Sequence, residues 1–194
     1  MGSAFELAVV HRNEAVATKM LDLGIQEIKR IESLLTEFSE DSFTSTINRM
    51  SGKKPVKVPE EVFNIVKRSL QISSLTQGFF DITVGPLKKL YRFKNDEFEF
   101  PSKKEIRKTL QQTGYRFIDL NNDEQSIFLR KEHMHISFAA IGKGYAADTV
   151  KKVWLQNGIE SGYINASGDL TAFGLNEKNE QWKIGVANPD KTDQ

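Results

Sequence analysis

The chain contains no cysteine in its 194 residues. Disulfide frameworks, thiolate zinc sites and cysteine nucleophiles are therefore excluded. Net charge is almost absent as well, because 27 basic and 26 acidic side chains leave +1 at pH 7. This balance argues against a surface built for nucleic acid or anionic membranes. No apolar run is long enough to span a bilayer, and no signal peptide is visible at Met1.

The composition is that of an ordinary soluble globular protein, with 39% hydrophobic and 27% charged residues. The length suits one domain of ordinary size, or two small interlocked lobes, and is enough to bury a core. There is no internal repeat, low-complexity segment or clear linker. We therefore predict one domain over residues 1–194.

Hydrophobic periodicity and capping signals predict both helices and strands. An apolar stripe indicates a helix over 14–35. Further helices are expected to open at Pro59 and end near Gly78, to run from Ser102 to Gly114, and to run from 144 to 157. Alternation and β-branched content predict strands at 5–10, 117–120, 126–130, 134–138, 161–165, 169–173 and 182–187. These elements predict an α+β fold with mixed or antiparallel sheets and packed helices.

One candidate site is the run Gly78–Leu87, which contains two adjacent aromatics followed by an acid. Aromatic faces such as those of Phe79 and Phe80 can stack on a planar heterocycle, and Asp81 can accept hydrogen bonds from ring or ribose donors. Gly85-Pro86 then indicates a turn. On residue types alone, a buried strand ending in a turn is the favoured alternative.

A second run, Ala140–Asp148, is rich in small residues around Lys143. A P-loop would need glycine five residues before the Gly-Lys pair and Ser or Thr after the lysine, and this chain has Ser137 and Gly144 there. Small residues instead let a ligand approach the backbone, and a helix beginning near Gly144 would offer free N–H groups to a diphosphate. A tight turn with an exposed lysine is the alternative.

A third run is Asn165–Leu170, in which Asn165 and Asp169 are either ligand contacts or turn stabilisers. The three histidines do not have a metal-binding spacing. His133 and His135 are expected on one face of a strand, in a structural or surface role.

Taken in order, these runs resemble the ApbE family, the flavin transferases that act on FAD. Met1-Gly2-Ser3 and Glu37-Phe38, with the later Ser42 and Asn48, match its first motifs. The resemblance covers nearly all of the chain and implies an ApbE-like fold. It also implies that the sequence ends before the family's C-terminal third.

The resemblance implies FAD contacts at seven positions: Met1, Phe38, Phe79, Phe80, Asp81, Ser137 and Lys143. It assigns one magnesium ligand, the backbone carbonyl of Ala140, a suitable hard oxygen. Ser137 stands where many members have Asp or Glu, and Phe38 where Tyr is common. The family's other metal ligands, an Asp and a Thr, and a candidate general-base His belong to motifs beyond Gln194. No catalytic residue is assigned in this chain.

The implied activity is magnesium-dependent transfer of the FMN moiety of FAD to a Ser or Thr hydroxyl of a target flavoprotein, releasing AMP. Alternatives are hydrolysis of FAD to FMN and AMP, FAD binding without turnover, and a scaffold with a degenerate pocket. The expected partner is a flavin-carrying subunit of a membrane redox complex. The expected location is the periplasmic side or, after processing, the inner membrane, with the cytoplasm as the alternative.

Overall fold

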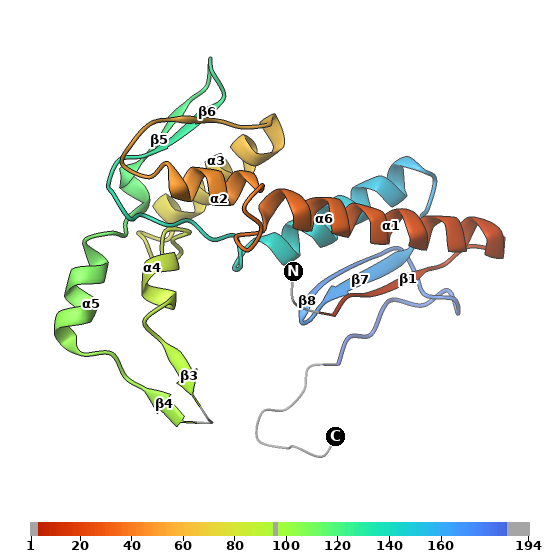
Figure 1. The fold of residues 1–194 in the computed structure, drawn as a ribbon. Coiled ribbons are helices and arrows are strands. Elements are labelled where there is room, and N and C mark those ends of the chain that lie inside the picture. The colour runs from red at the N-terminus through yellow and green to blue at the C-terminus, as the bar shows by residue number, and fades with distance from the viewer. Residues whose placement is uncertain (1–3, 95–96, 186–194) are drawn as a thin grey trace. The chain divides into compact units, whose positions relative to one another are not determined.

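The computed structural model describes residues 4–94 and 97–185 (Figure 1). Its backbone contacts divide these residues into two compact units. The central unit consists of residues 30–142, and the terminal unit combines residues 4–29 with residues 143–185. A single domain over residues 1–194 stays a prediction.

The terminal unit contains a three-stranded antiparallel sheet with the order β1-β7-β8. Its strands are β1 (Glu6–Val9), β7 (Gly162–Ala166) and β8 (Asp169–Phe173). Two helices contribute to this unit: α6 (Gly142–Gln156) and the first part of α1 (Glu14–Leu35). The bounds of α1 and β8 are those predicted from the sequence.

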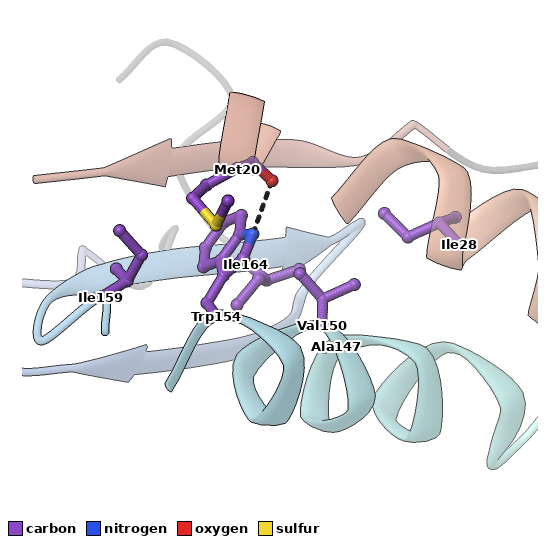
Figure 2. Packing of buried hydrophobic residues seen from close by; sticks show 7 residues of the cluster. All are labelled: Met20, Ile28, Ala147, Val150, Trp154, Ile159 and Ile164. Atoms are coloured by element: carbon purple, nitrogen blue, oxygen red, sulfur yellow. Dashed lines mark hydrogen bonds between the residues drawn. The ribbon is translucent and has the colours of Figure 1, made fainter. Parts of the chain in front are cut away.

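The core of the terminal unit gathers around Trp154, whose side chain is fully buried (Figure 2). Its indole N–H donates to the Met20 carbonyl at 2.7 Å, so α6 is tied to α1 by a polar bond inside an apolar cluster. Satisfying the indole nitrogen in this way removes the main cost of burying tryptophan. The cluster of buried residues consists of Met20, Ile28, Ala147, Val150, Trp154, Ile159 and Ile164.

The central unit is mainly helical, with a second antiparallel sheet of order β2-β6-β5. Its helices are α2 (Phe43–Arg49), α3 (Glu60–Leu75), α4 (Gly85–Lys88), α5 (Lys103–Leu110) and the 3₁₀ turn Tyr115–Phe117. The sheet consists of β2 (Val56–Lys57), β5 (Ile118–Asn121) and β6 (Ser126–Leu129). A two-stranded ladder joins β3 (Arg92–Lys94) to β4 (Glu97–Glu99).

Helix ends in this unit follow the signals in the sequence. Ser102 and Glu105 form the predicted capping box, each side chain bonding the other's backbone N–H. Pro59 occupies the N-cap position of α3, one residue before the predicted place. Gly78, with φ +89°, donates its N–H to the Ser73 carbonyl and ends α3 as predicted. These contacts are local, which is why sequence reasoning found them.

The α+β class is confirmed, and all described ladders are antiparallel. Residues 134–138, however, do not form the predicted strand. The Asn48 amide takes the place of a neighbouring strand, because it donates to the Ile136 carbonyl at 3.0 Å and accepts the Ile136 N–H at 2.8 Å. The next N–H, of Ser137, goes to the Ile82 carbonyl. The segment is thus extended but paired with a side chain and a loop.

Two further predictions were wrong in their extent. A strand was predicted at 182–187, but its described part, residues 182–185, is irregular. Trp182 instead packs edge-on to Tyr163 and donates its indole N–H to the Phe173 carbonyl. The helix predicted to reach Gly114 ends at Leu110. The Gly114 N–H instead donates to the Thr83 hydroxyl at 2.7 Å.

Candidate functional site

The central unit contains a polar cluster around Glu37, which we call the Glu37 clamp: Glu37, Lys88, His135 and Ser137. One carboxylate oxygen accepts from the Ser137 hydroxyl at 2.9 Å and from the Lys88 ammonium at 3.1 Å. The other lies 2.9 Å from Nε2 of His135. The Glu37 side chain is only 12% exposed, so its charge depends on these partners.

Two opposing effects act on the Glu37 carboxyl. Burial raises its pKa, while the bonds from His135, Lys88 and Ser137 lower it and prevail, so the pKa lies below its usual value of 4.5. Because the pKa of Glu37 is lowered in the folded state, the clamp stabilises the fold at pH values above the pKa that Glu37 has in the unfolded chain. That contribution is lost as the pH falls through the pKa that Glu37 has in the folded protein.

We therefore expect the wild type to lose more of its free energy of unfolding than Glu37→Gln between about pH 5 and about pH 3. Urea unfolding at a series of pH values measures the difference. Glu40→Gln, which alters an exposed acid of the same loop, should keep the wild-type pH dependence. Parallel curves for wild type and Glu37→Gln would contradict the assignment.

Two of the predicted aromatic contacts present their rings to solvent. Phe38, which directly follows Glu37 in the chain, is 88% exposed, and Phe79 is 96% exposed. An exposed phenylalanine contributes little to folding, and a free face is what stacking on a planar ligand requires. Both rings belong to the central unit. Phe80 is half-buried, and its N–H donates to the Thr76 hydroxyl at the end of α3.

Asp81 already has partners within the protein. Its Oδ1 accepts from the Thr83 N–H at 2.8 Å and from the Thr83 hydroxyl at 2.7 Å, and its Oδ2 accepts from the Tyr115 N–H at 2.9 Å. The Asp81–Thr83 turn is thereby fixed to the start of the 3₁₀ turn. The buried strand considered for this run is absent, because residues 79–84 form turns and bends. A flavin contact by Asp81 stays a prediction alongside this structural role.

The turn predicted at Gly85-Pro86 is the first turn of α4. A Cβ on Gly85 would lie 2.5 Å from Cδ2 and 2.7 Å from the carbonyl oxygen of His135. Only glycine lets α4 approach so closely, and this approach places Lys88 and His135 around one carboxylate. The prediction that His133 and His135 lie on one face of a strand is wrong. His133 lies in a turn with φ +63°, outside any strand.

The segment that carries Ser137 and Ala140 leads into α6. Ser137 is buried, and the Ala139 N–H lies 3.4 Å from its hydroxyl oxygen. Ala139 and Ala140 are exposed, as a ligand-facing turn of small residues requires. Within residues 4–94 and 97–185, no group of three or more His, Cys, Asp or Glu side chains is arranged to hold a metal ion. Ala140 therefore remains the one predicted magnesium ligand in the chain.

Lys143 lies in the first turn of α6 and belongs to the terminal unit. Its ammonium is 3.3 Å from Oδ2 of Asp169, and both side chains are partly exposed. The run Asn165–Asp169 forms the tight β7–β8 turn, with Ser167 and Gly168 both at positive φ. Asn165 stabilises this turn by accepting the Gly168 N–H at 2.9 Å. The turn-stabilising alternative for Asn165 is confirmed.

The structure thus places Phe38, Phe79, Phe80, Asp81, Ser137 and Ala140 in the central unit and Lys143 in the terminal unit, while Met1 lies outside the described residues. It joins Glu37, next to Phe38, directly to Ser137. The sequence predicted no site role for Lys88, only a motif match for Glu37 and only a structural or surface role for His135. The adjacency of Glu37 to Phe38 was the available signal, but nothing in the sequence marks this acid as partly buried.

The central unit also contains a cleft of about 570 Å³. Its lining is polar and partly basic, and none of the predicted site residues contributes to it. The residues that line it are Asn48, Pro86, Lys89, Lys108, Thr109, Gln112, His133, Met134 and His135.

Comparison with known proteins agrees with the order of motifs. The model of the ApbE family matches residues 1–194. A protein of Klebsiella pneumoniae (strain 342) named FAD:protein FMN transferase is 32% identical over 189 residues, which are 97% of this chain and 57% of that protein. One of Escherichia coli (strain K12) with the same name is 29% identical over 162 residues, 81% of this chain and 46% of that protein. The chain thus spans about half the length of these relatives.

Solved structures show the same fold. The ApbE protein of Thermotoga maritima superposes with a TM-score of 0.90 at 27% identity, over 99% of this chain and 62% of that one. The flavin transferase ApbE of Vibrio cholerae superposes with a TM-score of 0.86 over 97% of this chain and 62% of that one. Its identity of 21% supports the fold alone.

Proposed function

The chain belongs to the ApbE family, and on this basis we propose that its protein transfers the FMN moiety of FAD to a Ser or Thr hydroxyl of a target flavoprotein. The observation that carries the proposal is the alignment of 97% of the chain with a protein named FAD:protein FMN transferase at 32% identity. The exposed rings of Phe38 and Phe79 and the placement of Lys143 in the first turn of α6 are consistent with a flavin dinucleotide as substrate.

In the proposed reaction, the acceptor hydroxyl oxygen attacks the phosphorus of the FMN half of the diphosphate. The bond from this phosphorus to the bridging oxygen breaks, and AMP leaves with that oxygen. The hydroxyl proton passes to a base that we do not assign to any residue of this chain. Catalysis of such a phosphoryl transfer depends mainly on positioning and on neutralising charge.

The chain's own residues would bind and orient FAD. Phe38 and Phe79 offer free ring faces for stacking on a planar heterocycle. Lys143 offers a point charge to the diphosphate, in the first turn of α6, where the helix dipole favours an anion. The Asp169 carboxylate, 3.3 Å from the ammonium, holds this lysine in place through a partly exposed pair that a phosphate can replace.

Magnesium dependence is part of the proposal, but the described residues do not make a magnesium site. The Ala140 carbonyl is one oxygen, whereas magnesium requires near-octahedral coordination. No cluster of acidic, histidine or cysteine side chains among the described residues supplies the others. We therefore derive no step through the ion from this chain.

The target and the location are proposals as well. We propose a flavin-carrying subunit of a membrane redox complex as the acceptor, met transiently on the periplasmic side. The net charge of +1 suits transient contact with a protein better than adhesion to anionic lipid. In the described part of the chain, no helix is both long and apolar enough to cross a bilayer.

The test incubates the protein that carries this chain with FAD, magnesium and an acceptor flavoprotein, and it measures AMP release and covalent flavin fluorescence on the acceptor. We expect both, and we expect both to be lost when a chelator removes magnesium. FMN and AMP without labelled acceptor would favour hydrolysis, and FAD binding without AMP would favour a binding protein. Absence of FAD binding would overturn the proposal.

Lys143→Ala should slow AMP release about ten- to a hundredfold, which corresponds to the loss of one charged hydrogen bond. Lys152→Ala, which alters an exposed lysine of the same helix, is the matched control and should leave the rate unchanged.

A further inference from the structure

The loop that carries Phe38 is held by polar bonds and leaves the ring itself free. The ring is 88% exposed, so packing against the protein does not set its direction. The Phe38 N–H donates to the Thr36 hydroxyl at 3.2 Å, and the Ser42 hydroxyl donates to the Thr36 carbonyl at 2.6 Å. These bonds are internal to the loop, and they do not tie it to the segment around Ser137.

Glu37 makes that connection. Its carboxylate accepts from Lys88 at the end of α4 and from Ser137, and it lies 2.9 Å from Nε2 of His135. The residue immediately before Phe38 is thus fixed to two other parts of the central unit. The Ser137 hydroxyl proton is committed to the carboxylate, so the Ser137 oxygen faces any further group as an acceptor.

We propose that Glu37 is a positioning residue for FAD, which fixes the position of the loop that carries Phe38 and the orientation of the Ser137 hydroxyl. The inference rests on the proposed function, in which both residues contact FAD. A loop whose backbone is already held in place loses less conformational freedom when a ligand stacks on the ring that it carries. A single half-buried carboxylate therefore prepares two predicted contacts at once.

A role in stability alone explains the Glu37 clamp less well. The Lys88 side chain is 54% exposed, and exposed ion pairs add little to stability. Partial burial of the Glu37 carboxylate costs desolvation energy, and an apolar residue would avoid this cost. A charge kept next to an exposed aromatic ring is better explained by its fixing the loop that carries this ring.

The test is a double-mutant cycle on FAD affinity, measured by flavin fluorescence titration with the protein that carries this chain. Glu37→Gln replaces one acceptor oxygen by an amide donor without changing the shape of the side chain. Phe38→Leu keeps an apolar side chain and removes the aromatic face. We expect each single variant to weaken FAD binding about three- to tenfold. The double variant should lose less affinity than the product of the two single losses, because part of the effect of Glu37 passes through Phe38 and the rest through Ser137.

Glu40→Gln, an exposed acid two residues after Phe38, is the matched control and should bind FAD as the wild type does. If Glu37→Gln did not fold, Lys88→Met would remove the half-exposed donor instead, with a smaller loss of affinity that Phe38→Leu should also reduce. The positioning role of Glu37 would be overturned, with the proposed function left standing, by either of two results. One is a double variant whose loss of FAD affinity equals the product of the two single losses, and the other is unchanged FAD affinity in Glu37→Gln. A wild type without affinity for FAD would overturn the proposed function itself.

Discussion

Replacing Trp154 by alanine is expected to lower the free energy of unfolding by about 3–5 kcal/mol. The side chain is fully buried in the terminal unit, where it contacts α1 and the β1-β7-β8 sheet. Truncation would leave a cavity between these elements, because close-packed neighbours relax only partly. It would also remove the indole donor from the Met20 carbonyl.

Urea unfolding followed by far-ultraviolet circular dichroism measures this loss. Leu155→Ala is the matched control, since Leu155 is the next residue of α6 and is 49% exposed. It should cost far less than Trp154→Ala. Trp154→Phe should lie between the two, because it keeps most of the apolar volume and loses the hydrogen bond. Similar losses for Trp154→Ala and Leu155→Ala would contradict the packing described for the terminal unit.

Asp81→Ala is expected to reduce both stability and FAD affinity. Its carboxylate accepts from the N–H groups of Thr83 and Tyr115 and from the Thr83 hydroxyl. Removing it leaves these donors without their acceptor, at a cost of about 1–3 kcal/mol of unfolding free energy. The loop that presents Phe79 and Phe80 would lose its attachment to the 3₁₀ turn. We expect FAD binding to weaken by a comparable free energy, about five- to a hundredfold.

Thr83→Val separates the two roles of Asp81. It removes the buried hydroxyl that joins Asp81 to the Gly114 N–H, yet it leaves the carboxylate in place. If Asp81 also contacts FAD, Asp81→Ala should weaken FAD binding clearly more than Thr83→Val does at a similar loss of stability. Equal losses of affinity would mean that Asp81 acts only by holding the loop. Fluorescence titration and urea unfolding of both variants give the comparison.

Much of the secondary structure was predictable because its causes are local. The apolar stripe of α1 repeats within one helix, and the bounds 14–35 were predicted correctly. The capping box of α5 joins residues three positions apart. The hairpin of β5 and β6 was predicted from two short strands around a polar loop, and β5 and β6 pair as expected.

Elements whose stability comes from distant partners were missed or wrong. Helix α2 is short and rich in Ser and Thr, which are weak helix formers. Besides its Ser42 cap, the bonds of Asn48 to Ile136, 88 residues away, hold it. The strand predicted at 134–138 failed because its pairing partner is the Asn48 side chain. Alternation in a sequence indicates an extended chain, and it does not indicate what that chain will pair with.

The sequence by itself determined the family, the fold class and which residues are candidates for FAD binding, since ordered motifs and periodicity are properties of the linear chain. Only the tertiary structure decided that Asp81 accepts from Tyr115, 34 residues away, and that Glu37 joins His135 and Ser137 across 98 and 100 residues of sequence. A carboxylate's role depends on the donors that reach it and on how far water is excluded, and both are set by folding.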